Sequence, residues 1–455
     1  MLSLQKASHI YSEFQNIIET GESSYLSDAI VHSSDKICEL MNNLNADSVL
    51  YLKNYLSVEN FIKSISVDNI EVIGYKKDNN RCRYENFYVN IDKICEMANP
   101  ALFGKGNETI YDENVRKAFD ISANRIRLRE TEPQENKFNY FFKNIIPINK
   151  KFKYELYKMH IYKEGGKFSR HKDTIHAPNH YATLVISIPT KFTGGELLLY
   201  ENKGDENPLT TCNLKHSNSV IFLTDVEHEV LEVKSGTRIV LQYDVYLEDK
   251  ISDKDEYEDE YENEYEDEYE EDDNNECPYN KDNKTYLSSK KYIENLNTNI
   301  DTILLEEVEK FMLSHHIDDE ICFLLSRQYP LTITEEYLKA GDKKLYDILS
   351  SKYLIEIGYA VNHYGSDCDG LYSKIDKEKL KVMNYTNIKK FLQQFKYDEK
   401  LDGNKNKSKI KTHIFVAGGK FKATKCSEYI EHTGNEASPA EYTYVSVTLC
   451  CKRKV

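Results

Sequence analysis

The chain has 455 residues, a formal net charge of −16 at pH 7 and 40% apolar residues. Because single cores stop growing near about 250–300 residues, this length predicts two or three domains rather than one. The charge is local: Asp253–Glu276 holds 16 acidic residues and one lysine, so the remainder is close to neutral and lacks the basic character typical of nucleic-acid binding.

The cysteines and the apolar runs bear on the cellular compartment. Ten cysteines are scattered without a CxxC pair, so the sequence shows neither a zinc ribbon nor a redox motif. The first residues lack a long apolar segment, and no run of 18 apolar residues occurs. We therefore expect a reduced, intracellular protein, cytoplasmic or nuclear, that is neither secreted nor membrane-spanning.

Residues 1–140 are expected to form an N-terminal mixed helical region. Apolar residues recur at helical spacing from Leu4 to Ile18, and a second helical stretch is expected from about Leu26 to Leu44. We interpret this region as support for the core that follows, with recruitment of a substrate as the alternative.

Residues 141–250 change to short strands. Leu184, Ile186 and Ile188 alternate with Thr183, Val185 and Ser187, and a second alternating run begins at Arg238 and ends at Leu247. Glycine-containing turns such as Gly194-Gly195 separate the runs. This pattern predicts an antiparallel sandwich or jelly roll rather than a parallel sheet.

Two further regions follow the strands. Residues 251–284 contain repeated acidic-tyrosine units, which should form a solvated, disordered linker and could also attract basic partners. Residues 285–455 begin with an amphipathic helical pattern from Ile300 to Met312 and end in strand-like alternation from Thr412 to Cys451. We expect an α+β C-terminal domain there, which gives an α+β fold class for the whole chain.

His171 and Asp173 form an HxD pair, and two residues at this spacing on an extended segment project to one face. A second imidazole would complete the two-histidine, one-carboxylate set that binds non-haem iron(II) and leaves coordination positions open. His228 can be that residue, and it is expected in the turn after a strand at Ser219–Thr224. Ten residues later, Arg238 offers a guanidinium fork suited to a carboxylate.

Three stretches carry a family resemblance: YKEGGKFSRHKD, ATLVISIPTKFTGGELLLY and VEHEVLEVKSGTRIVLQYDVYL. Together they resemble the iron(II)- and 2-oxoglutarate-dependent dioxygenases, in particular the prolyl-4-hydroxylase-like branch, over about residues 154–247. The resemblance implies a double-stranded β-helix (jelly roll) with flanking helices, iron(II) on His171, Asp173 and His228, and 2-oxoglutarate held by Arg238 and lying against Tyr162. It also implies dioxygen as co-substrate, ascorbate as a supporting reductant, and succinate and carbon dioxide as co-products.

The substrate is less well defined. Ser187, Leu197 and Arg238 stand where prolyl hydroxylases usually carry tyrosine, threonine and lysine, so the chemistry is indicated more clearly than a proline substrate. We expect hydroxylation of a protein or peptide side chain. The alternatives are a non-catalytic binding or scaffold module on the same fold, and an AlkB-like nucleic-acid oxygenase. Asp244 counts against the latter, because that branch typically has a second arginine at this position.

His176 and His180 are also candidates for a metal site by their spacing. Pro178 lies between them and makes a helix, and therefore a helical zinc pair, improbable. We expect both in an exposed loop after the HxD pair, where a substrate could pass.

Overall fold

The structure, a computed structural model, describes most of the chain. The described residues are 34–44, 50–77, 84–105, 108–131, 134–142, 145, 150–201, 205–215, 218–249, 300–315, 319–330, 332–364, 381–383, 413–417, 424–430 and 440–454. The helix expected at residues 4–18 and the acidic linker expected at 251–284 lie outside them.

The chain divides into two compact units. The central unit is Val49–Asp272, and the terminal unit combines Met1–Ser48 with Asp273–Val455. This division differs from the expected boundary at residue 140, because the strands between residues 50 and 130 belong to the same unit as the HxD strands.

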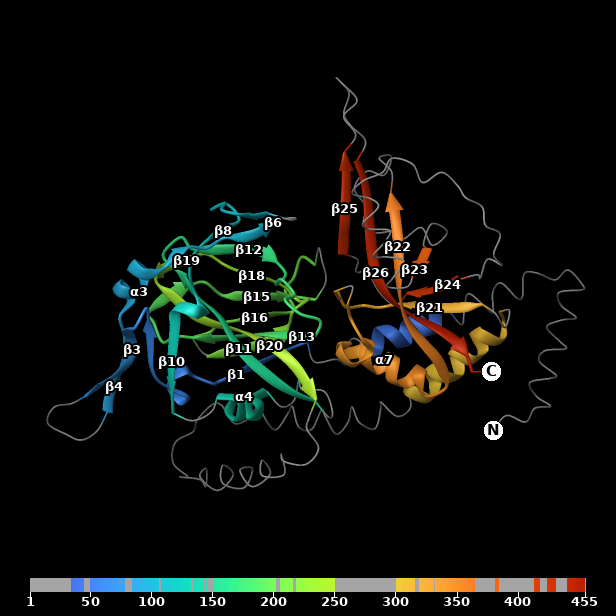
Figure 1. The fold of residues 1–455 in the computed structure, drawn as a ribbon, viewed down its shortest axis with the longest axis horizontal. Helices are drawn as coiled ribbons and strands as arrows, with labels where there is room; N and C mark the ends of the chain where they lie inside the picture. The colour runs from blue at the N-terminus through green and yellow to red at the C-terminus, as the bar shows by residue number, and fades with distance from the viewer. Residues whose placement is uncertain are drawn as a thin grey trace, which may run out of the picture. The chain divides into compact units, whose positions relative to one another are not determined.

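The central unit is built on a seven-stranded sheet with the order β1-β17-β13-β20-β11-β9-β5, in which all strand pairs are antiparallel. The strands are β1 Tyr51–Asn54, β17 Ser219–Leu223, β13 His180–Ser187, β20 Arg238–Asp249, β11 Lys150–Tyr162, β9 Phe119–Ser122 and β5 Asn99–Pro100. β20 begins at Arg238, as the alternation predicts, and lies between β13 and β11. Its long pairing with both neighbours makes it the central strand of the unit (Figure 1).

A second, five-stranded antiparallel sheet has the order β16-β15-β18-β12-β8. Its strands are β16 Thr210–Cys212, β15 Leu197–Tyr200, β18 Glu227–Val230, β12 Lys167–His171 and β8 Arg116–Lys117. This sheet runs alongside the larger one (Figure 1). All eight residues of β13 are buried, including the polar Thr183 and Ser187, so the larger sheet is covered on both faces at this strand.

The remaining elements of the central unit cover and extend these sheets. α4 Gln134–Phe142 packs Phe138 against Tyr154 and Tyr243 of the larger sheet, with ring centroids 4.9 Å and 5.4 Å apart. A four-stranded sheet consists of β10 Ile126–Glu130, β2 Ile62–Val67, β3 Ile70–Lys77 and β4 Tyr84–Val89. Two strand pairs follow: β14 Phe192–Gly194 with β19 Val233–Gly236, and β6 Phe103–Lys105 with β7 Glu108–Ile110. The remaining elements are the helix α3 Ile91–Met97 and the 3-10 turns η1 Val58–Asn60 and η2 Ala123–Arg125.

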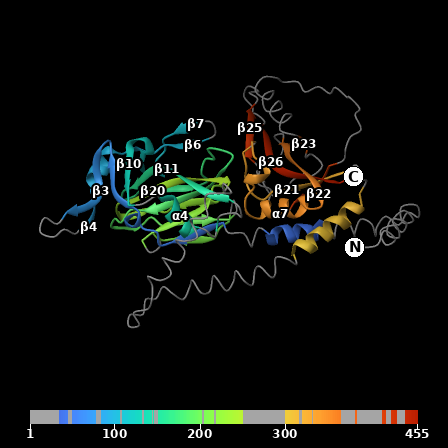
Figure 2. The same cartoon turned by 60° about the horizontal axis from the view of Figure 1, so that its bottom comes forward.

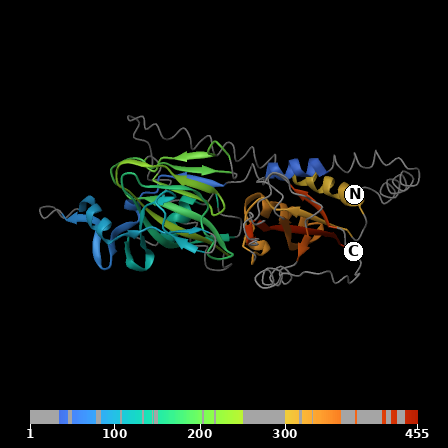
Figure 3. The same cartoon turned by 90° about the horizontal axis from the view of Figure 1, so that it is seen from above.

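The terminal unit is a sheet with the order β23-β22-β26-β21-β24, and β25 also pairs with β26. Its elements are β21 Glu320–Leu324, η6 Glu335–Tyr337, α7 Ala340–Ser350, β22 Tyr353–Tyr364, β23 Lys381–Met383, β24 His413–Ala417, β25 Thr424–Ile430 and β26 Ala440–Arg453. A helix at 300–313 appears where the apolar spacing predicts one, and it lies beside the helix at 34–44 (Figures 2 and 3). Ile37, Leu40 and Leu304 share one buried core, so the N-terminal helix completes this unit.

The structure is thus mostly antiparallel strands with few helices in its described parts, and the pair β21–β24 is parallel. None of the described helices combines the length and the apolar character that crossing a bilayer requires.

Candidate metal and anion site

His171 and His228 face each other across two paired strands. They are cross-strand partners of β12 and β18, and their ring centroids are 4.2 Å apart. His228 therefore lies in a strand and not in the turn where we expected it. The reason is that β18 pairs with β12 on one side and with β15 on the other, which extends the backbone around His228.

Backbone carbonyls determine which nitrogen of each ring is available. Nδ1 of His171 donates to the carbonyl of Ser169 at 2.9 Å, and Nδ1 of His228 donates to the carbonyl of Val226 at 3.0 Å. A carbonyl oxygen only accepts, so in the neutral ring Nδ1 carries the proton and Nε2 keeps a lone pair. Metal-binding histidines typically have this arrangement, in which the outer nitrogen donates to a fixed acceptor.

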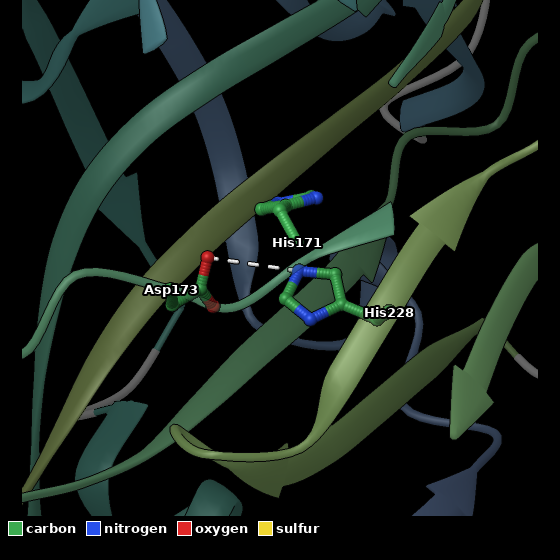
Figure 4. Close-up of side chains that lie close together, drawn as sticks. All are labelled: His171, Asp173 and His228. Carbon is green, nitrogen blue, oxygen red and sulfur yellow. Dashed lines mark ion pairs between the residues drawn. The ribbon is translucent and has the colours of Figure 1, made fainter. Parts of the chain in front are cut away.

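Asp173 follows the end of β12 and completes the group. Its Oδ1 lies 3.6 Å from Nε2 of His228, as Figure 4 shows. Its Oδ2 accepts a hydrogen bond of 2.6 Å from the hydroxyl of Thr183 on β13. Ligand atoms of the three residues all lie within 4.8 Å of one another, close enough to hold one metal ion.

The protonation of this group suits a cation. Burial, together with the charge of the neighbouring His228, lowers the pKa of His171 to about 3. Burial alone would raise the pKa of Asp173, but His228, His171 and the hydrogen bond from Thr183 lower it overall. At neutral pH the group therefore offers a neutral imidazole and a carboxylate, which are the forms that bind metals.

A buried polar network that the sequence analysis missed supports His171. The ring of Phe168 stacks on the imidazole of His171, and the guanidinium of Arg116 lies 4.4 Å from the centroid of the same Phe168 ring. Arg116 also donates to Nδ1 of His160 at 3.0 Å, and Nε2 of His160 lies 2.8 Å from Oε1 of Gln242. No motif marks these residues, because Arg116 reaches the site only through the pairing of β8 with β12.

Arg238 lies at the start of β20, and its side chain is fully buried. None of the described ion pairs includes it, and its Nε and Nη1 atoms have no hydrogen-bond partner among the described residues. Burial lowers the pKa of this guanidinium from its usual value. A buried guanidinium without an anion is costly, so this position indicates an anionic ligand.

Tyr162 and Gly195 surround this arginine. Tyr162 is the cross-strand partner of Arg238, and its ring centroid lies 5.1 Å from the guanidinium carbon. Gly195 has a φ of +68°, and a Cβ on it would lie 3.0 Å from Cδ of Arg238. The Gly-Gly turn expected from the sequence therefore also makes room for the arginine side chain.

Of the two histidines expected in an exposed loop, His176 lies in one and His180 does not. His180 begins β13 and is buried, whereas His176 precedes it in the connection from β12. Both contact the carboxylate of Asp244, with distances of 2.7 Å from Nδ1 of His176 and 3.7 Å from Nε2 of His180. The structure thus places a second histidine and aspartate group in the same unit.

One segment of the central unit is similar to a known protein family. Residues 157–243 match the family model described as the 2OG-Fe(II) oxygenase superfamily, and this segment includes His171, Asp173, His228 and Arg238. An uncharacterized protein of Fowlpox virus (strain NVSL) is 33% identical over 95 residues, which is 20% of this chain and 21% of that protein. The chain therefore matches only about a fifth of the length of this curated relative.

Part of the chain is also similar to solved structures. An oxidoreductase of the 2OG-Fe(II) oxygenase family from Burkholderia pseudomallei has 17% identity and a TM-score of 0.23, with 34% of this chain and 78% of that chain covered. A prolyl-4-hydroxylase from Pseudomonas putida has 17% identity and a TM-score of 0.23, with 35% and 82% covered. A viral collagen prolyl hydroxylase from Paramecium Bursaria Chlorella virus-1 has 19% identity and a TM-score of 0.20, with 29% and 79% covered.

Proposed function

We propose that this protein is an iron(II)- and 2-oxoglutarate-dependent dioxygenase that hydroxylates a C–H bond. The observation that carries the proposal is the pairing of two sites in the segment that matches the superfamily: a His-Asp-His group, and a buried arginine with no ion-pair partner among the described residues. A histidine cluster or a buried arginine by itself is compatible with a purely structural role, whereas the cofactor pair of this superfamily needs both sites.

His171, Asp173 and His228 would hold the metal. Their donor set is the two-histidine, one-carboxylate set of non-haem iron(II) sites. Nδ1 of each histidine is already engaged by a backbone carbonyl, and Oδ2 of Asp173 is engaged by Thr183. The protein therefore orients the free donor atoms before any ion binds, which reduces the reorganisation that binding requires.

Arg238 would hold the distal carboxylate of 2-oxoglutarate. Its fork of N–H donors matches a carboxylate, and the surrounding side chains exclude water, so a paired anion there is bound more strongly than at the surface. Tyr162 lies against the guanidinium and would form one wall of this pocket. When bound, iron(II) with 2-oxoglutarate and dioxygen supplies the oxidation of the C–H bond, with succinate and carbon dioxide as co-products.

The substrate we propose is a protein or peptide side chain. The sequence stretches around the site resemble the prolyl-4-hydroxylase-like branch, and the chain outside its acidic tract is close to neutral. Asp244 in place of an arginine argues further against a nucleic-acid substrate. We also propose that the two facing sheets of the central unit form a double-stranded β-helix.

The test is succinate formation by the purified full chain with iron(II), ascorbate and 2-oxoglutarate. We expect turnover by the wild type, and a loss in Asp173→Ala and in Arg238→Ala. Arg125→Ala is a matched control, because Arg125 pairs with Asp68 outside the site. Wild-type turnover no greater than that of Asp173→Ala would contradict the proposal and favour a non-catalytic binding module.

A second measurement tests the substrate class. Peptide and oligonucleotide libraries would be incubated with the active enzyme and analysed by mass spectrometry for one added oxygen atom. We expect the mass increase on peptides. Its appearance on oligonucleotides alone would contradict the substrate proposal while leaving the dioxygenase proposal intact.

A further inference from the structure

The group of His176, His180 and Asp244 lies close to the proposed metal site but outside it. Oδ2 of Asp244 accepts from Nδ1 of His176 at 2.7 Å, and Oδ1 faces Nε2 of His180 at 3.7 Å. Candidate ligand atoms of the three residues lie within 4.8 Å of one another, as in the first group. The composition is therefore the same, and hydrogen bonding must distinguish the two groups.

Hydrogen bonding argues that the second group is not a metal site. The backbone N–H of His176 donates to Nδ1 of His180 at 3.2 Å, so this nitrogen accepts and the proton of the neutral ring lies on Nε2. A metal at Nε2 would have to displace that proton. The histidines of the first group have the opposite arrangement, with Nδ1 as donor. Asp244 instead accepts a hydrogen bond from the His176 ring, and its other oxygen lies 3.7 Å from Nε2 of His180, beyond hydrogen-bond distance.

The two histidines lie within the segment that joins two parts of the first site. This segment starts at Asp173 and ends at Thr183, whose hydroxyl donates to Oδ2 of Asp173. Thr183 and Asp244 are cross-strand partners on β13 and β20. Side chains of cross-strand partners project to the same face of a sheet, so Asp244 lies beside the residue that contacts the metal-binding carboxylate.

Other contacts tie the same segment to β20 and β11. The backbone N–H of Leu247 donates to the carbonyl of Asn179 at 2.9 Å, and the side chain of Asn179 donates back to the carbonyl of Leu247 at 3.2 Å. The ring of Tyr157 packs on His176, with centroids 4.9 Å apart, and the rings of His176 and His180 stack at 5.3 Å. Asp244 is the carboxylate among these contacts, because it accepts from the His176 ring and lies 3.7 Å from Nε2 of His180.

We propose that Asp244 is a positioning residue for Asp173. Its hydrogen bond with His176, beside the buried ring of His180, holds the connection between β12 and β13 against the sheet, and this directs the Asp173 carboxylate toward His171 and His228. Asp173 needs such support because it follows the end of β12 and is not itself part of a strand. The inference rests on the proposed function, since it assigns a role toward the metal site.

The test measures cobalt(II) binding by the full chain through its visible absorption spectrum. We expect Asp244→Asn to bind cobalt(II) about 10- to 100-fold more weakly, with a changed spectrum, because the amide keeps only one acceptor oxygen. Asp120→Asn is the matched control: Asp120 is a buried carboxylate of the same sheet, but it pairs with Lys158 and not with the connection. Its cobalt(II) affinity and spectrum should match the wild type.

A second variant keeps the test informative if Asp244→Asn folds poorly. His176→Phe retains a ring against Tyr157 but removes the N–H that Asp244 accepts, and its partial exposure makes it tolerable. We expect His176→Phe to weaken cobalt(II) binding. The double variant of His176→Phe and Asp244→Asn should lose no more cobalt(II) affinity than Asp244→Asn alone, because both substitutions remove the same hydrogen bond.

The outcomes separate the inference from the proposed function. Wild type that binds cobalt(II) no better than Asp173→Ala would overturn the metal site, and the inference with it. Wild type that binds tightly, together with unchanged affinity and spectra in Asp244→Asn and His176→Phe, would overturn the positioning role alone.

Discussion

The ring of Phe168 stacks on the imidazole of His171, with centroids 3.5 Å apart and ring planes inclined by 23°. The guanidinium of Arg116 also packs on Phe168, so an aromatic ring separates a buried cation from a residue of the proposed metal site. The stack supports the imidazole mechanically, and the ring also stabilises the arginine through its π electrons.

Phe168→Ala should therefore destabilise the protein strongly. Removing a buried aromatic ring loses both its burial and its stacking, and we expect a loss of about 3 kcal/mol in the free energy of unfolding, measured by urea denaturation. The control is Leu102→Ala, since Leu102 is 46% exposed and its truncation should change stability by no more than about 0.5 kcal/mol. A loss below about 1 kcal/mol for Phe168→Ala would contradict the role of the stack.

Arg238→Met should have opposite effects on stability and on ligand binding. Methionine fills a similar volume and removes a buried charge without an anion, so the ligand-free protein should gain about 1–3 kcal/mol in the free energy of unfolding. With manganese(II) present, 2-oxoglutarate should stabilise the wild type by about 2.7 kcal/mol at a concentration 100 times its Kd, and the variant not at all. Thermal unfolding with and without 2-oxoglutarate measures both effects.

Arg125→Met serves as the control for that experiment. Arg125 pairs with Asp68 near the surface, so its loss should cost at most about 1 kcal/mol and leave the response to 2-oxoglutarate intact. An Arg238→Met protein that is less stable than the wild type and still responds to 2-oxoglutarate would show that Arg238 is not an anion-binding residue.

His160 predicts a loss of stability in acid. Burial, and then the charge of Arg116, lower its pKa well below the ordinary 6.5. Below pH 6.5 the unfolded chain therefore binds a proton that the folded protein excludes, and folding loses stability as the pH falls. At pH 5.5 this one residue should cost about 1.4 kcal/mol relative to pH 7.5.

The comparison is between the wild type and His160→Gln. Urea denaturation at pH 7.5 and 5.5 should show a smaller decrease in the variant, by about 1.4 kcal/mol. Between pH 7.5 and 8.5 the two proteins should change equally, because His160 is neutral in both states there. Equal decreases between pH 7.5 and 5.5 would mean that His160 is not held neutral in the folded protein.

Asp342 is expected to anchor the segment 326–329 to the helix α7 in the terminal unit. Its buried carboxylate accepts from the backbone N–H groups of Ser326 and Arg327 and from the hydroxyl of Tyr329, at 3.0, 2.8 and 2.9 Å. Asp342→Ala would leave these buried donors without their acceptor and should cost about 3 kcal/mol by urea denaturation.

The matched control lies on the same helix. Asp347 is exposed on α7 and pairs with Lys343, so Asp347→Ala should change stability by less than about 1 kcal/mol. Neither variant should alter cobalt(II) binding, because the partners of both residues belong to the terminal unit. Equal stabilities of the two variants would refute the anchoring role of Asp342.

Part of the candidate site could be predicted from the sequence. The alternation that begins at Arg238 predicts a strand, and the structure starts β20 at that residue. The HxD spacing, together with a later histidine, identifies His171, Asp173 and His228 as a possible group, and the structure brings them together. These predictions succeed because strand periodicity and short spacings are local properties of the chain.

Other parts depended on contacts between residues far apart in the chain. The alternation around Thr183 predicted a strand, but only the structure shows that β13 is buried throughout because both of its faces are covered. The helix at 34–44 shares a core with the helix at 300–313. A local sequence pattern can predict each helix but not which other helix it packs against.

The sequence by itself thus determined the strand character of the centre and the identity of the residues that could bind a metal and an anion. Only the tertiary structure decided that His228 faces His171 from a paired strand, and that Arg238 is buried with no ion-pair partner among the described residues. It also decided that Asp244 accepts from His176 and lies beside His180. The physical reason is that strand register, burial and hydrogen-bond direction are set by long-range pairing, which the order of residues in a single strand does not contain.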